Sequence, residues 1–143
     1  MRDRDIFKRA EEYRDRIDAL RPFSNVILKQ IRQYYRIGLT WSSNALEGNS
    51  LTESETKVLL EDGLTVGGKP IRDYYEATGH ARAYDFMYEL AGDHLITEDD
   101  ILTLHRLFYE QIDASLAGVY RKEKVIITGS RYPTPGPEKI KKM

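Results

Sequence analysis

Residues 43–52 read SNALEGNSLT and mark the point where one long helix ends and the next one begins. Apolar residues recur at helical spacing over residues 24–47, which predicts a helix that crosses the whole domain. Gly48 is expected to end that helix, because glycine readily adopts the left-handed conformation that closes helices. Thr52 then opens another helix, in a capping box with Glu55.

The polar groups at the end of the long helix are unusual for such an apolar element. Ser43 and Glu47 lie four residues apart, so they share one face and the hydroxyl can touch the carboxylate. A carboxylate at the C-terminal end of a helix opposes the helix dipole and needs a cation to answer it. The residues alone leave two interpretations open: a chemical site, or a plain polar helix end with Gly48 as the residue after the cap.

The remaining pattern predicts an all-α helical bundle with one β-hairpin. Apolar stripes, capping residues and prolines define the helices, and a β-branched run followed by a glycine turn defines the hairpin. The expected elements are helices over residues 3–20, 24–47, 52–63 and 70–92, a helix that opens at residue 97, a strand over 125–128 and a last helix that starts at residue 137.

The predicted hairpin is a candidate for peptide binding. Pro133 and Pro135 blunt any second strand, so the strand over 125–128 would keep an exposed edge. Such an edge can accept an extended peptide through main-chain hydrogen bonds. An ordinary surface hairpin is the other interpretation.

Composition excludes several classes of function. The 143 residues contain no cysteine, which excludes disulfide scaffolds, cysteine zinc sites and thiol catalysis. The net charge of -1 lacks the basic footprint of a nucleic-acid binder, and no apolar run is long enough for a membrane span. The N-terminus shows no signal peptide, so the expected compartment is the cytoplasm. His80, His94 and His105 lack metal-site spacing, and each is expected to be a surface or partly buried side chain.

Several stretches together resemble the Fic (Fido-domain) family. Residues 43–52 are similar to its inhibitory-helix motif, Ser/Thr-x-x-x-Glu-Gly/Asn. Residues 73–81 are similar to its Glu-x-x-Asn-His helix, with Gly79 at the usual asparagine. The leucine–histidine helix, the Gly-x-Tyr-Arg segment, the flap and the proline-rich exit resemble residues 101–105, 118–121, 125–130 and 133–135.

The resemblance implies a parent activity that these residues cannot perform alone. Fic proteins transfer AMP from ATP, with Mg²⁺, to a hydroxyl side chain of a target protein. Their catalytic loop reads His-Pro-Phe-x-(Asp/Glu)-Gly-Asn, and the 143 residues contain no such loop. We therefore expect an inactive N-terminal part of an autoinhibited adenylyltransferase, with no catalytic or metal-binding residue and no tight binding of ATP or Mg²⁺. Residues 1–63 would hold the inhibitory helix, and residues 64–143 the beginning of the Fic core.

The resemblance also implies roles for individual residues. Glu47 would pair with an arginine of the catalytic loop and displace the ATP γ-phosphate, Ser43 would orient Glu47, and Gly48 completes the inhibitory motif. The flap would align the target backbone through Val125, Ile126, Ile127, Thr128, Gly129 and Ser130.

The expected partner is a protein that presents a Ser, Thr or Tyr hydroxyl. We also expect self-association, or a partner, at the uncovered apolar helix faces, and we expect neither nucleic acid nor a membrane. The alternative from a different class is a non-catalytic helical interaction module. A His-Pro-Phe loop further along the gene would decide for the enzyme.

Overall fold

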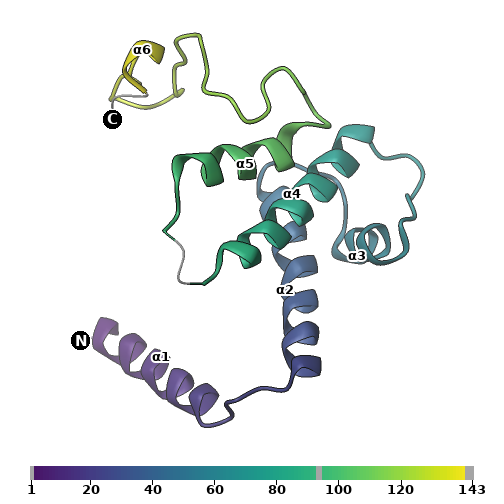
Figure 1. The fold of residues 1–143 in the computed structure, drawn as a ribbon, viewed down its shortest axis with the longest axis vertical. Helices are drawn as coiled ribbons and strands as arrows, with labels where there is room; N and C mark the ends of the chain where they lie inside the picture. Colours follow the sequence, from purple (N-terminus) through teal and green to yellow (C-terminus); the bar gives the residue numbers. More distant parts are fainter. Residues whose placement is uncertain (1, 93–94, 141–143) are drawn as a thin grey trace. The chain divides into compact units, whose positions relative to one another are not determined.

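A computed structural model describes residues 2–92 and 95–140, and these residues form helices and loops without a β-strand (Figure 1). The all-α fold class is therefore confirmed. His94 lies outside the described residues. The helices are α1 (Arg2–Asp18), α2 (Asn25–Leu46), α3 (Glu53–Asp62), α4 (Ile71–Leu90), α5 (Glu98–Tyr109) and α6 (Pro137–Ile140).

The chain divides into two compact units, Met1–Tyr34 and Tyr35–Met143. The first unit holds α1 and the beginning of α2. The apolar stripe predicted for α1 is largely exposed, with Ile6 61% and Ile17 49% accessible to solvent. The division after residue 63, which the sequence suggests, stays a prediction.

The core of the second unit is small and centred on α4. Leu51, Leu59, Tyr74 and Ala77 form one buried cluster. These side chains come from α3, from α4 and from the loop that follows α2. Since Leu51 packs against both α3 and α4, the loop after α2 is held by these two helices.

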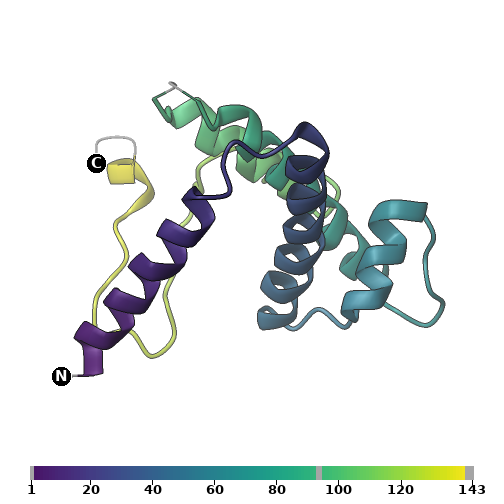
Figure 2. The same ribbon diagram turned by 90° about the horizontal axis from the view of Figure 1, so that it is seen from below.

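Helices α4 and α5 approach each other very closely, and they lie side by side in both ribbon views (Figures 1 and 2). The contact point is Gly79, where an added Cβ atom would stand 2.3 Å from the main-chain oxygen of Phe108. No side chain fits at that separation. The glycine at the position where the Fic pattern has asparagine is therefore a requirement of this helix pair.

Three of the predicted helix starts are confirmed by their capping hydrogen bonds. Thr52 and Thr97 each form a capping box, with Glu55 and Asp100 as partners. At the start of α2, the Ile27 N–H donates to the Ser24 hydroxyl at 3.3 Å. These signals involve residues only three apart, so the sequence alone determines them.

The predicted β-hairpin is wrong: residues 121–136 form an irregular loop with no strand in the part of the chain that the structure describes. Two physical reasons explain the difference. Pro133 and Pro135 have no N–H group, so the expected second strand cannot donate the ladder bonds that would pair it with residues 125–128. A hairpin of two strands without a third strand or a helix against it is also only marginally stable.

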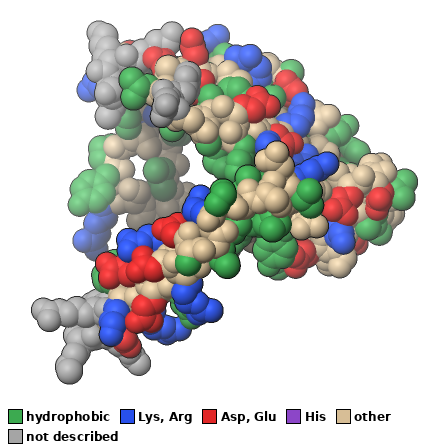
Figure 3. Space-filling model, turned by 60° about the horizontal axis from the view of Figure 1, so that its bottom comes forward, with side chains coloured by type: hydrophobic (Ala, Val, Ile, Leu, Met, Phe, Trp, Pro, Cys, Tyr) green, Lys and Arg blue, Asp and Glu red, His purple; other side chains and the backbone are tan. Residues whose placement is uncertain are grey.

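Apolar side chains are exposed at several places in the second unit. Leu39 on α2, Met87 on α4 and Ile101 on α5 are each between 43% and 55% accessible. Figure 3 shows hydrophobic side chains at the surface among charged ones on the face that it draws. None of the helices in the described part of the chain combines the length and the hydropathy of a membrane span.

We expect Gly79→Ala to destabilise the protein, because the new methyl group would collide with the main chain of Phe108. Overpacking of this kind typically costs about 1–3 kcal/mol. Gly38→Ala is the matched control, since Gly38 lies in the middle of α2 with open space around its Cα. That change should stabilise the helix by up to about 1 kcal/mol. Urea unfolding of both variants measures the difference, and equal stability of the two would contradict the close approach.

Candidate regulatory and target-docking sites

The end of α2 is closed by a Schellman motif, which fixes where Glu47 lies. The Asn49 N–H donates to the Asn44 carbonyl at 3.0 Å, and the Gly48 N–H donates to the Ala45 carbonyl at 3.1 Å. Gly48 has a φ of 92°, in the region that favours glycine. The prediction that Gly48 ends the helix is thus confirmed, and Glu47 is the last residue before the turn.

The Glu47 carboxylate is exposed and stands at the negative end of the helix dipole. Ser43 lies one turn earlier and is partly buried. Among the described residues, neither side chain makes a hydrogen bond or an ion pair, so the expected contact between them is not formed. The cation that the dipole argument calls for is likewise not supplied by this part of the chain.

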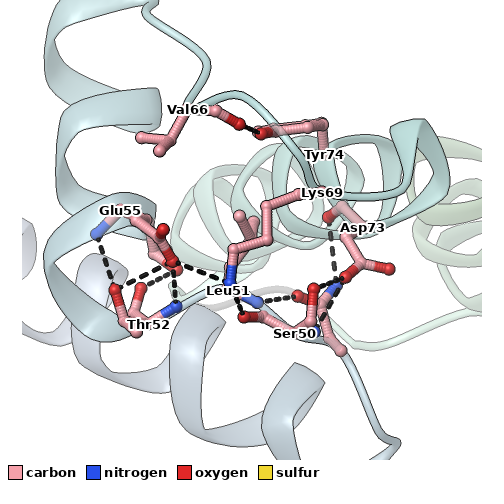
Figure 4. A network of polar contacts seen from close by, with 10 residues as sticks. Ser50, Leu51, Thr52, Glu55, Val66, Lys69, Asp73 and Tyr74 are labelled. Carbon is pink, nitrogen blue, oxygen red and sulfur yellow. Dashed lines mark hydrogen bonds and ion pairs between the residues drawn. The ribbon is translucent and has the colours of Figure 1, made fainter.

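The loop that follows α2 is bound to the first turn of α4 by Asp73, which is buried (Figure 4). One carboxylate oxygen of Asp73 accepts hydrogen bonds from the Ser50 N–H at 2.8 Å and from the Ser50 hydroxyl at 2.5 Å. The Asn49 amide donates to the main-chain oxygen of Asp73 and to the Glu76 carboxylate, both at 3.0 Å. Both residues after Gly48 are therefore anchored on α4.

Lys69 binds the same loop from the other side, and joins it to α3 (Figure 4). Its ammonium group donates to the Ser50 carbonyl at 2.6 Å and lies 3.4 Å from the Glu55 carboxylate. Hydrogen bonds from the Thr52 backbone and side chain, with the nearby Lys69, lower the pKa of Glu55. The carboxylate therefore stays charged and serves both the cap of α3 and the lysine.

Apolar packing and one further hydrogen bond complete this junction. Leu51 is only 4% accessible and packs in the core with Leu59 and Tyr74. The Tyr74 hydroxyl donates to the carbonyl of Val66, which ties the loop between α3 and α4 to α4 (Figure 4).

Two polar contacts join the second half of α2 to the middle of α4. Arg36 and Asp85 form an ion pair at 3.0 Å. The Thr40 hydroxyl, which is fully buried, lies 2.9 Å from Nδ1 of His80. Burial lowers the pKa of His80, since an apolar surrounding disfavours the charged imidazole. The prediction of a partly buried histidine is thus confirmed for His80.

The predicted flap, residues 125–130, and His105 make no contact with the junction at the end of α2 through a hydrogen bond or ion pair of the described residues. The six flap residues, 125–130, are all exposed, and Ile126 is 86% accessible. One turn is formed within these residues, in which the Ser130 N–H donates to the Ile127 carbonyl at 3.1 Å. His105 is exposed, and its Nδ1 accepts from the Gly118 N–H at 2.9 Å. No hydrogen bond or ion pair of the described residues links the flap to the end of α2.

The residues that anchor the end of α2 were not among the predicted site residues. Asp73 and Lys69 act on Ser50 across 23 and 19 residues of sequence. A periodic or capping signal does not reveal such pairs. Asn44 was also missed: it is buried, and its Nδ2 has no partner among the described residues.

The described side chains do not form a metal centre. No three or more His, Cys, Asp or Glu residues of the described ranges gather in a way that could hold an ion. These residues do not fit Mg²⁺.

Comparison with known proteins confirms the resemblance seen in the sequence. No family model matches the chain. The chain is 29% identical over 142 residues to the protein adenylyltransferase Fic of Nematostella vectensis, covering 98% of this chain and 33% of the relative. It is 30% identical over 141 residues to the protein adenylyltransferase fic-1 of Caenorhabditis elegans, covering 96% of this chain and 27% of the relative. The chain thus spans about a third or less of these relatives.

Solved structures agree with these relatives. Fic-1 from C. elegans superposes with a TM-score of 0.77 at 29% identity, over 98% of this chain and 40% of that one. A Fic-domain-containing signalling protein from Bacteroides thetaiotaomicron superposes with a TM-score of 0.78 at 27% identity, over 90% and 50%. The fold is that of the helical part of Fic-domain proteins. The chain is a relative of the Fic-type protein adenylyltransferases.

We expect Asp73→Ala to destabilise the second unit, because it removes both hydrogen bonds to Ser50. Bonds to a charged group contribute about 1.5–3 kcal/mol. Asp62→Ala is the control, since Asp62 is an exposed acid at the end of α3 where the helix dipole disfavours it. Thermal unfolding measures both, and a loss in the control as large as that in Asp73→Ala would contradict the anchoring role.

Stability should fall as the pH is lowered below about 6.5, the pKa that His80 has in the unfolded chain. The unfolded imidazole takes up a proton there, whereas the buried one resists it because its pKa is lowered. The loss begins near pH 6.5 and ends below the folded pKa. Urea unfolding at several pH values, compared between the natural chain and His80→Gln, measures the effect. An unchanged pH profile in the variant would show that other groups cause the loss.

Proposed function

We propose that this chain works as the regulatory and target-docking part of an autoinhibited protein adenylyltransferase. The enzyme would transfer AMP from ATP to a Ser, Thr or Tyr hydroxyl of a target protein. The relatives, which are protein adenylyltransferases, and the shared fold support this proposal. The observation that carries it is the exposed Glu47 carboxylate at the anchored end of α2.

Glu47 is the inhibitory residue in this proposal. Its carboxylate stands exposed where the helix dipole disfavours it, so a cation from elsewhere would bind it favourably. An arginine of the catalytic loop suits this role, because its planar fork binds carboxylates and phosphates alike. Glu47 would compete with the ATP γ-phosphate for that arginine. In the longer protein Ser43 would orient Glu47 from the preceding turn, through a contact that the described residues of this chain do not form, and Gly48 allows the helix to end directly behind Glu47.

ATP and Mg²⁺ belong in this proposal to the segment with the His-Pro-Phe loop. The 143 residues do not contain that loop, and the described side chains offer no metal site. We therefore expect this chain alone to bind neither ATP nor Mg²⁺ tightly and to transfer no AMP.

The proposed partners are a target protein and a second copy of the chain. The loop over 125–130 would dock the target, and the exposed apolar residues of α2, α4 and α5 would support self-association. Residues 1–63 would form the inhibitory part and residues 64–143 the start of the Fic core. Neither nucleic acid nor a membrane is a proposed partner. The cytoplasm is the proposed compartment, with which the lack of cysteine is compatible.

Replacement of Glu47 by glycine tests the inhibitory role. In a longer protein that carries the His-Pro-Phe loop, Glu47→Gly should raise AMP transfer about tenfold or more. A tenfold rise corresponds to a barrier lowered by about 1.4 kcal/mol when ATP is no longer displaced from its reactive position. In the 143-residue chain it should have no effect. Transfer to a target protein is followed with labelled ATP on gels.

Asp62→Gly is the matched control, because Asp62 precedes Gly63 at the end of α3 as Glu47 precedes Gly48 at the end of α2. Both acids are exposed, so loss of a charge or of helix propensity affects both variants alike. Activation by both changes, or by neither, contradicts the inhibitory role of Glu47. Transfer by the 143-residue chain alone contradicts the assignment of catalysis to the His-Pro-Phe loop.

A further inference from the structure

The loop over residues 121–136 has a defined path, although no ladder of main-chain hydrogen bonds holds it. Its second half contains Pro133 and Pro135, whose nitrogens cannot donate a hydrogen bond. These two prolines can therefore take part in a link between the two ends of the loop only through their carbonyl groups.

Arg121 provides such a link. One terminal nitrogen of its guanidinium donates to the Glu123 carbonyl at 3.0 Å, and the other donates to the Pro135 carbonyl at 2.7 Å. The two carbonyls belong to opposite ends of the loop. A second link lies just inside, where the Thr134 hydroxyl donates to the carbonyl of Val125.

The guanidinium is well suited to this task and an ammonium group is not. Its donors point in fixed directions in one plane, so one side chain can bridge two carbonyls at a fixed separation. A lysine keeps the charge but offers a single nitrogen on a flexible stem. Arg121 therefore supplies geometry to the loop as well as charge.

The segment between these links keeps main-chain groups open for a partner. Among the described residues, the main-chain groups of Ile126 and Thr128 make no hydrogen bond within the chain. An extended peptide can pair with them, and it binds more tightly when the segment is already ordered, because ordering a free loop costs conformational entropy at binding.

We propose that Arg121 is a positioning residue that closes the loop and so presents residues 125–130 to the target protein. This inference rests on the proposed function, in which that segment docks the target. Arg121 does not touch the reacting groups in this scheme. It lowers the entropy that the docking segment loses when a target binds.

The first experiment tests the closure in the 143-residue chain and needs no activity. Backbone ¹⁵N order parameters are measured for residues 124–131 in the natural chain, in Arg121→Lys and in Arg121→Gln. Both variants should fall toward values below about 0.6, which are typical of flexible loops. Cleavage by trypsin within the loop should become about tenfold faster, as expected for the loss of charged hydrogen bonds.

Arg131→Lys is the matched control, because Arg131 lies in the same loop and makes no hydrogen bond or ion pair among the described residues. It should leave the order parameters and the cleavage rate unchanged. If Arg121→Lys leaves the loop as rigid as it is in the natural chain, the closure is overturned. Loosening by Arg131→Lys to the same extent would overturn it too.

The second experiment tests the docking role in a longer protein that transfers AMP. Arg121→Lys should raise the KM for the target protein about tenfold, with kcat and the KM for ATP unchanged, because only target binding pays for ordering the loop. A loosened loop with an unchanged KM for the target overturns the docking role. If the longer protein transfers no AMP, the proposed function fails, and the first experiment still decides whether Arg121 closes the loop.

Discussion

The hydrogen bonds from Ser50 to the Asp73 carboxylate are the constraint on which the second unit depends. They fix the short connection between α2 and α3 onto the first turn of α4, and Lys69 holds the same connection from the side of α3. Leu51 can then fill the core beneath it. Because the connection is short and is held by these bonds, the main chain at the end of α2, including that of Glu47, is tied to α4.

The second unit thus combines two kinds of surface. The end of α2 is closed by main-chain hydrogen bonds, is followed by a loop anchored on the buried Asp73, and carries the exposed acid Glu47. The loop over residues 121–136 has no secondary structure, and a few side-chain bonds give it its path. In the proposed function, an acid that must fit one arginine needs the first kind of surface, whereas a docking segment that accepts an incoming chain can use the second.

The sequence predicted the features that neighbouring residues determine. The capping boxes at Thr52 and Thr97 and the helix end at Gly48 are decided within a few positions, and all three are found in the structure. The hairpin failed because strand pairing depends on a partner segment, and prolines occupied that segment. The anchoring by Asp73 was invisible for a related reason: its partner lies 23 residues away, and no local pattern marks the pair.

The close approach of α4 to α5 at Gly79 has a consequence for how this fold can be changed. A helix with asparagine at that position cannot lie as near to α5, so it requires a different separation of the two axes. A different separation of the two axes would change every other contact between α4 and α5 as well. A chimera with a Fic protein that has asparagine at this position would therefore have to exchange both helices together, because neither helix fits the neighbour that the other protein provides.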